Sequence, residues 1–489
     1  MAAELTRFGV SVRIIDKAAK RTDKSKALVM WSRTVELIDR MGCGSTFLAS
    51  GCRTSNVTVV AGSKRIGSIA LDGLETPHPY ALMIPQSETE RLLEQHLDSL
   101  GVRIERSVEL VKFTETNNQV AASLRLEDGS EESTVSSWLI GCDGAHSTVR
   151  HQLGLTFSGR TLKSSWILAD VGLRGDSVPG GFEIGWHSDG ALAIFLVSPD
   201  RYRIIANAGT SRDGATRSDP TLEEVQALLD RRGPGGIVAH DPTWLSSYVI
   251  NERIVDRYRS GRCFLAGDSA HIHSPAGGQG MNTGIQDACN LAWKLALICR
   301  GVCEPEPLLG SYNTERRAVG KRVVSDTGKI TALAVLRGAI PQAVRNRVAP
   351  LVFNLPPVVK KIAAKMAEIS IGYPRSPLTE PSLQFFGGPI PGSRAPIREG
   401  EAPVGSGDLP RFILFASPDD QSAALCEGYP DLLDPTFPKP FRVGGMWLVR
   451  PDGYVALVAR QGDWRSVERY LRLLSATPVA VVSRRRPGN

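Results

Sequence analysis

The sequence predicts an α/β fold, in which buried strands run into polar turns and then into helices. Three apolar stretches carry this prediction, because each ends in an acidic residue, which is Asp16, Asp143 or Asp268. In an open α/β sheet, ligands bind beyond the carboxyl ends of the strands. We therefore expect these three carboxylates to lie at a ligand site.

Length and composition indicate a globular protein of two or three domains, with 489 residues, 42% of them hydrophobic and 22% charged. No segment approaches the ~20 uncharged apolar residues of a membrane span, and the start lacks the pattern of a signal peptide. A cytosolic protein without a membrane partner is expected. Only 6% of the residues are aromatic, too few to suggest stacking on nucleic acid, so no nucleic-acid partner is expected despite the net charge of +7.

A glycine-rich segment follows Asp268 and leads into a helix predicted from Asn282 to Arg300. Glycines at 277, 278 and 280 would let the backbone lie against a flat ring. The helix start would direct free N–H groups and a positive dipole end at that ring. Reduced flavin carries negative charge at its pyrimidine edge, which such a helix start stabilises. The alternative is an ordinary glycine-rich loop before a core helix.

The whole string from Arg262 to Asn282 resembles the second flavin-contacting motif of the group A aromatic hydroxylases. These are FAD-dependent monooxygenases of the para-hydroxybenzoate hydroxylase type, and the similarity is greatest to the phenol and polyketide hydroxylase branch. The resemblance covers nearly the whole chain. It implies a Rossmann-like FAD-binding domain, an interleaved mixed β-sheet substrate domain and a thioredoxin-like C-terminal domain.

The resemblance also implies the reaction. In the family, NAD(P)H reduces FAD, O2 adds at the flavin C4a carbon, and the resulting hydroperoxide transfers a hydroxyl group to an aromatic ring. A phenolic or polyketide-like small molecule is therefore the expected substrate. No protein nucleophile is required, and the sequence identifies no catalytic residue.

Ten residues are predicted to contact the cofactor. The resemblance places Gly278, Gly280, Met281 and Asn282 at the isoalloxazine ring, with Pro275 over its reactive side. Asp268 would accept hydrogen bonds from the ribityl hydroxyls.

The other four contacts lie outside that string. Asp143 would lie near the pyrophosphate and the path of NAD(P)H, and Asp16 at the ribose hydroxyls. Lys26 stands where the family usually has an arginine that reaches the phosphates; it keeps the charge but not the planar fork. Gln86 resembles the glutamine that binds the ribityl-phosphate region, and it precedes a predicted capping box of Ser87 and Glu90.

The strand and Gly-x-Gly-x-x-Gly turn that should precede Asp16 are not found in this sequence. Either about a dozen N-terminal residues are missing through a misassigned start, or the chain is a truncated, non-catalytic paralogue that acts as a binding or scaffold protein. We favour the first alternative, because the later motifs are intact.

These motifs predict four regions. They are a FAD-binding domain (1–54, 84–160 and 258–325), a substrate-binding sheet domain (55–83 and 161–257), a helical segment with a linker (326–386) and a thioredoxin-like domain (387–489). The last contains only Cys426, which excludes dithiol redox chemistry. It could instead have a structural or oligomerisation role, such as formation of a homodimer.

Other enzyme classes fit the sequence less well. His271 and His273 alternate, but no Cys or His cluster supplies the further ligands that zinc needs, so no metal is expected. A serine hydrolase would need a Gly-x-Ser-x-Gly turn. A flavin halogenase would need a Trp-x-Trp-x-Ile-Pro string, and the sequence has neither motif.

Overall fold

The computed structural model describes residues 1–62, 64–210, 217–382, 387–398 and 400–476, which form two compact units. The first unit combines Met1–Val12, Cys289–Glu315 and the chain from Gly372 onward. The second combines Arg13–Ala288 and Arg316–Ile371. All ten residues predicted to contact the cofactor belong to the second unit.

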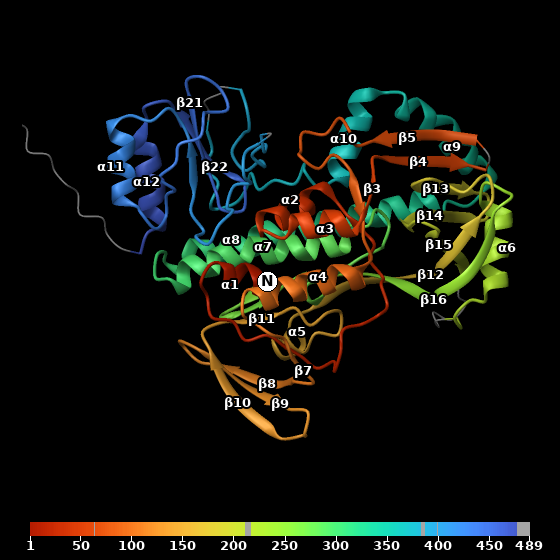
Figure 1. The fold of residues 1–489 in the computed structure, drawn as a ribbon, viewed down its shortest axis with the longest axis horizontal. Helices are drawn as coiled ribbons and strands as arrows, with labels where there is room; N and C mark the ends of the chain where they lie inside the picture. Colours follow the sequence, from red (N-terminus) through yellow and green to blue (C-terminus); the bar gives the residue numbers. More distant parts are fainter. Residues whose placement is uncertain (63, 211–216, 383–386, 399, 477–489) are drawn as a thin grey trace, which may run out of the picture. The chain divides into compact units, whose positions relative to one another are not determined.

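An eight-stranded mixed sheet dominates the second unit (Figure 1). Its order is β19-β16-β12-β15-β14-β13-β4-β5, with a parallel pair at β13 and β4 and antiparallel pairs elsewhere. The strands are β4 (Asn56–Ala61), β5 (Lys64–Ala70), β12 (Phe157–Arg174), β13 (Phe182–His187), β14 (Gly190–Ser198), β15 (Arg201–Thr210), β16 (Val238–Val255) and β19 (His271–Ile272). Strands from two distant parts of the sequence thus share one sheet, which confirms the predicted interleaving.

Short parallel strands form the α/β part of the same unit. β1 (Ile15–Asp16) pairs with β7 (Glu105–Arg106), and β11 (Leu139–Gly141) pairs with β18 (Cys263–Leu265). β17 (Arg259–Ser260) continues the second group. The strand that ends the apolar stretch before Asp16 is short, because β7 pairs only with Ile15 and Asp16.

Helices and smaller sheets complete the second unit. The helices are α2 (Ser32–Arg40), α3 (Gly44–Ser50), α4 (Gln86–Ser99), α5 (Thr148–Gln152), α6 (Leu222–Arg232), α9 (Ala339–Phe353), α10 (Pro356–Met366) and parts of α7 (Gly280–Cys299) and α8 (Pro305–Ala334). The smaller sheets contain β2 (Val29–Met30), β3 (Cys52–Thr54) and β6 (Ala81–Met83), and β8 (Glu109–Glu115), β9 (Val120–Arg125) and β10 (Glu131–Ser136). Among the described residues, no helix is long and apolar enough to cross a membrane.

The start of α4 differs from the prediction. The helix begins at Gln86 with Pro85 as its N-cap, and the Ser87–Glu90 capping box does not form. Instead, Gln86 Nε2 donates a hydrogen bond to Glu90 Oε1 at 2.8 Å. Proline has a φ suited to a helix start and has no N–H. The helix therefore starts two residues before the position that the capping pattern indicates, since Ser87 as N-cap would make Glu88 the first helical residue.

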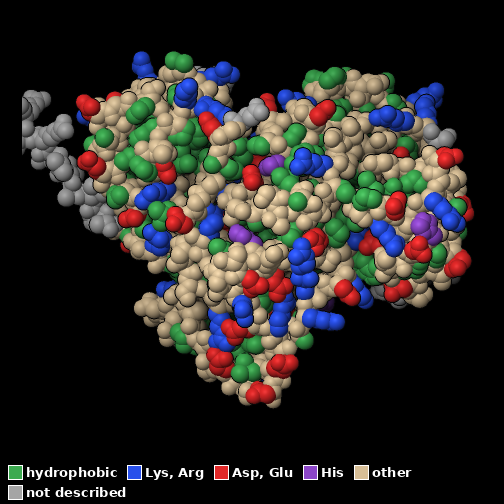
Figure 2. All heavy atoms as spheres, in the orientation of Figure 1, with side chains coloured by type: hydrophobic (Ala, Val, Ile, Leu, Met, Phe, Trp, Pro, Cys, Tyr) green, Lys and Arg blue, Asp and Glu red, His purple; other side chains and the backbone are tan. Residues whose placement is uncertain are grey.

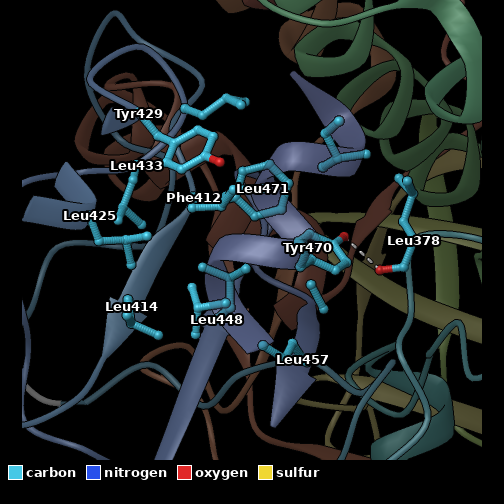
Figure 3. Close-up of a cluster of buried hydrophobic side chains, with 14 of the residues drawn as sticks. Leu378, Phe412, Leu414, Leu425, Tyr429, Leu433, Leu448, Leu457, Tyr470 and Leu471 are labelled. Carbon is cyan, nitrogen blue, oxygen red and sulfur yellow. Dashed lines mark hydrogen bonds between the residues drawn. The ribbon is translucent and has the colours of Figure 1, made fainter. Parts of the chain in front are cut away.

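The first unit contains α1 (Ala2–Arg7) and a C-terminal α/β layer. Its antiparallel sheet has the order β20 (Ile413–Phe415), β21 (Gly445–Val449) and β22 (Val455–Arg460), accompanied by α11 (Asp420–Gly428) and α12 (Trp464–Leu474). Figure 3 shows how apolar side chains from the sheet and α12 meet, with the Tyr470 hydroxyl donating to the Leu378 carbonyl at 2.9 Å. This layer agrees with the C-terminal α/β domain expected from the sequence.

A buried charge network stabilises the first unit. Glu315 receives hydrogen bonds from Arg450 at 2.5 and 3.0 Å, from Lys294 at 2.9 Å and from Asn290 at 2.7 Å. Burial alone would raise the pKa of Glu315, but Arg450 and Lys294 hold that pKa well below its ordinary range. Glu315 is therefore a buried anion that several donors stabilise together.

Candidate functional site

The two turns that carry Asp143 and Asp268 lie side by side. β11 and β18 run parallel with Gly141 opposite Leu265, so the chain leaves both strands at the same end of the sheet. Arg150 is buried and joins the turns, because its guanidinium donates to the Ser269 carbonyl at 2.9 Å and to the carbonyl of the Asp143 turn at Ala145. The convergence expected of these two carboxylate turns is present.

The Asp268 turn also packs against α7. Gly267 has a φ of +64°, and a Cβ at Gly284 of α7 would lie 3.3 Å from the Gly267 Cα atom. Larger residues at these two positions would push the turn and helix apart. The turn that carries Asp268 is thereby fixed next to the N-terminal part of α7.

The glycine-rich loop (residues 275–280) lies against β2. Gly278 has a φ of +61°, and a Cβ there would approach the Val29 Cβ atom to 3.0 Å. Trp31 Nε1 donates to the Gly277 carbonyl at 2.8 Å. The missing side chain of Gly278 therefore makes room for a neighbouring strand, so the glycine has a structural reason besides the predicted contact with a ring.

Asn282 is buried and holds this loop in place. Its Nδ2 atom donates to the carbonyls of Val29 at 2.8 Å and Gly278 at 2.7 Å, and its Oδ1 atom accepts from the Trp31 N–H at 2.8 Å. Met281 packs half-buried beside a hydrophobic cluster, and Pro275 is exposed. Contact of these three residues with a cofactor stays a prediction.

Asp268 is exposed to solvent, yet the surrounding protein shifts the pKa of its carboxyl group. Desolvation by the surrounding protein raises the pKa of its carboxyl group, while His271 and Lys26 act in the opposite direction. Lys26 is also exposed, so its ammonium group lies within electrostatic reach of this carboxylate and remains open to solvent. A charged pair of this kind suits a ligand with both hydroxyl and phosphate groups.

The side chains of three residues predicted to contact the cofactor accept hydrogen bonds from other parts of the chain. Asp143 Oδ2 accepts from the Val149 N–H at 3.1 Å, and Gln86 Oε1 accepts from the Ala27 N–H at 3.1 Å, next to Lys26. Asp16 Oδ2 accepts from Arg106 Nη1 at 2.7 Å. These bonds orient the side chains, and their roles toward a cofactor stay predictions.

Sequence reasoning missed Arg203, which connects the large sheet to the Lys26 loop. Arg203 of β15 is buried, holds both carboxylate oxygens of Asp170 at 2.7 Å, and donates to the Lys26 carbonyl at 2.9 Å. The sequence did contain a signal for this contact, because Asp170 and Arg203 are charged residues within otherwise apolar strands.

A second missed feature is a buried polar layer beneath the start of α7. His271 Nε2 lies 2.8 Å from Asp287 Oδ2, and Arg316 Nε donates to Asp287 Oδ1 at 2.6 Å. Burial opposes ionisation of Asp287, but Arg316 and His271 together hold its pKa below the ordinary value. Within the described residues, no group of three or more His, Cys, Asp or Glu side chains could hold a metal ion.

His273 offers a buried acceptor next to the glycine-rich loop. Its Nδ1 atom lies 2.8 Å from the Ser274 carbonyl and is assigned as the donor, so Nε2 carries the lone pair. Within the described part of the chain, Nε2 is buried without a hydrogen-bond partner, and it lies 3.7 Å from where a Gly280 Cβ would be. Burial, with His271 nearby, lowers the pKa of His273 to about 4, so the ring is neutral at physiological pH.

Comparison with known proteins places this geometry in context. The sequence profile described as "FAD binding domain" matches residues 1–327. The 6-methylpretetramide 4-monooxygenase of Streptomyces rimosus is 36% identical and aligns over 98% of this chain and 92% of its own length. The rifampicin monooxygenase of Rhodococcus hoagii is 34% identical over 76% of each chain.

Solved structures show the same fold. The anhydrotetracycline hydroxylase OxyS of Streptomyces rimosus superposes with a TM-score of 0.78 and 29% identity, covering 98% of this chain and 96% of that one. CabE, an aromatic hydroxylase from angucycline biosynthesis, gives a TM-score of 0.77 with 27% identity, covering 97% and 96%.

Proposed function

We propose, because the chain belongs to the FAD-binding family of flavin-dependent aromatic monooxygenases, that it hydroxylates a phenolic or polyketide-like small molecule with NAD(P)H and O2. The observation that carries this proposal is the convergence of the Asp143 turn, the Asp268 turn and the start of α7 in one unit. A non-catalytic binding protein would not need the relatives' aromatic-hydroxylase architecture along almost its whole length.

The residues present fit FAD. When bound, the cofactor accepts hydride from NAD(P)H and activates O2 for insertion of one oxygen atom into the substrate. The start of α7 and the ammonium group of Lys26 would stabilise its negative charges. Asp268 would accept hydrogen bonds from its hydroxyl groups, and His273 Nε2 would accept one from an N–H or O–H group of the cofactor or substrate.

The relatives support the proposed substrate class. Those named above act on 6-methylpretetramide, anhydrotetracycline and rifampicin. We propose that the eight-stranded sheet walls the pocket for a similarly large, multi-ring substrate, so that residues 55–83 and 161–257 form the substrate domain. Trp186 and Phe195 are buried in packing contacts of that sheet, with Arg345 and Phe182 respectively, so neither is an evident pocket residue. A cytosolic location and a homodimer remain predictions from the sequence.

The test begins with the purified chain supplied with FAD. We expect flavin absorbance, substrate-dependent NAD(P)H oxidation and one atom of isotope-labelled O2 in the aromatic product. Flavin binding without NAD(P)H oxidation would favour the non-catalytic alternative. NAD(P)H oxidation without oxygen incorporation across phenols and fused-ring polyketides would contradict the proposed reaction.

A matched pair of variants tests the site itself. Asp268→Ala removes an acceptor of charge-assisted hydrogen bonds, which contribute ~1.5–3 kcal/mol each, so FAD affinity should fall by about tenfold or more. Asp176→Ala removes an exposed carboxylate elsewhere in the same unit and should leave FAD affinity unchanged. Equal affinities for the two variants would show that Asp268 does not contact the cofactor.

A further inference from the structure

The net charge of the protein resides in one segment. Residues 327–367, here named the basic segment, contain seven of the 58 Lys and Arg residues of the chain and none of its 51 Asp and Glu residues. The rest of the chain is therefore balanced, and the segment alone accounts for the net charge of +7. By contrast, Figure 2 shows basic and acidic side chains interspersed over the face that it draws.

The same segment exposes an apolar stripe along α9. The first four stripe residues lie four, four and three positions apart, which places them on one face of α9, and the fifth is the N-cap residue of α10. Their side chains are between 48% and 78% exposed. They are Ile340, Val344, Val348, Leu351 and Leu355.

The opposite face of α9 packs against the eight-stranded sheet. Phe353 lies over Gly67 of β5, and the guanidinium of Arg345 lies 4.6 Å from the Trp186 ring centroid. The helix thus has one apolar face packed on the sheet and another facing outward. On the neighbouring helix α8, Ile330 and Leu333 are 44% and 46% exposed. Single exposed apolar residues need no explanation, but a continuous stripe indicates a binding surface.

Basic side chains flank the stripe. Arg347 lies within α9 between stripe positions, and Arg337 precedes the helix; both are exposed. Lys360 and Lys365 form ion pairs with Glu75 and Asp326. Within the described residues, no ion pair occupies Lys329, Arg337, Arg347 or Lys361, so these four charges are available to a partner.

These observations favour a partner that offers negative charges to the basic residues and an apolar region to the stripe. A second copy of the chain would bring the basic segment against itself, where like charges repel. Nucleic acid would need stacking aromatic residues, and the exposed stripe is entirely aliphatic. Protein interfaces are enriched in aromatic anchors, which the stripe also lacks. An aliphatic face flanked by Lys and Arg fits the boundary between the headgroups and acyl chains of a bilayer.

We propose that α9 binds the surface of an anionic lipid bilayer, with the stripe inserted at the acyl boundary and the four available basic residues against the headgroups. Such peripheral binding requires no membrane-spanning helix. The sequence-based expectation of no membrane partner rested on the lack of a spanning segment, and peripheral binding was not considered there.

Co-sedimentation of the FAD-loaded full chain with vesicles tests the proposal. Binding is expected to phosphatidylcholine vesicles that contain phosphatidylglycerol, to weaken with added salt, and to be nearly absent with phosphatidylcholine alone. Val344→Ser with Leu351→Ser should reduce binding by about tenfold or more. Arg347→Gln with Lys361→Gln should also reduce vesicle binding by about tenfold or more, because each basic residue near the surface contributes about fivefold. Both pairs are exposed, so FAD content and the unfolding temperature should not change.

Val443→Ser is the matched control, because Val443 is 98% exposed and lies outside the basic segment. This variant should bind vesicles as the unsubstituted protein does. Absence of binding to anionic vesicles, or equal binding to neutral ones, would overturn the proposal. Light scattering measures the oligomeric state. If the protein does not bind vesicles and forms a dimer that the Val344 and Leu351 substitutions convert to a monomer, the stripe is an interface between copies and the proposal is wrong.

Discussion

Replacement of Glu368 by Gln should stabilise the protein in a pH-dependent way. Glu368 is buried just after α10, and its Oε2 atom accepts a hydrogen bond from Gln286 Nε2. Burial raises the pKa of its carboxyl group to about 8, although the Arg316 charge opposes the change. At neutral pH the folded protein therefore holds a proton on Glu368 that an ordinary glutamate would have released.

The magnitude follows from the two pKa values. The unfolded chain loses this proton near pH 4.5 and the folded protein loses it near pH 8, so the stability of the unsubstituted protein falls as pH rises between these values. Within this window, each rise of one pH unit lowers the free energy of unfolding by ~1.4 kcal/mol. With allowance for relaxation around the charge, Glu368→Gln should be more stable by about 1–3 kcal/mol at pH 8 and about equal at pH 4.5.

Urea unfolding followed by tryptophan fluorescence at pH 5 and pH 8 measures the difference. Glu304→Gln is the control, since Glu304 is exposed and the substitution should change neither midpoint. A stability gain that is the same at both pH values, or a Glu368→Gln variant that is less stable at pH 8, would refute the reasoning.

Two further variants test the internal contacts. Glu315→Ala removes the carboxylate that pairs with buried Lys294 and one of the two that pair with Arg450, and it should destabilise the protein by ~3–5 kcal/mol in thermal unfolding; a loss below ~1 kcal/mol would contradict a role for the network in stability. Arg203→Lys removes the fork that holds Asp170 and the Lys26 carbonyl, and FAD titration should show about tenfold weaker binding with little change in the circular dichroism spectrum.

Local patterns predicted the parts of the molecule that depend on neighbours in sequence. The turns at Asp143 and Asp268 were identifiable because an apolar run, an acidic residue and a helix start follow one another within a few positions. The predicted start of α4 was wrong by two residues, because proline and a capping pattern competed at the same place. Both outcomes depend on residues within one helical turn.

Contacts between distant strands were not predictable in the same way. Arg203 reaches the Lys26 loop, and Arg316 reaches Asp287, only after the large sheet and helix α8 have folded. A charged residue within an apolar stretch indicates that a partner exists, since an unpaired buried charge is strongly unfavourable. It does not indicate which residue that partner is, because one strand can face several neighbours.

The hydrogen bonds of the predicted cofactor residues divide them into two groups. Asn282 and Gln86 direct their polar atoms to backbone and side-chain groups of the protein, so substituting them would disturb the loop whether or not a cofactor touches them. Within the described residues, the side chains of Asp268 and Lys26 form no such hydrogen bond, and His273 Nε2 is buried without a hydrogen-bond partner. A site holds a ligand accurately when supporting residues fix those that touch it. Loss of affinity without loss of stability is therefore expected at the second group, and loss of both at the first.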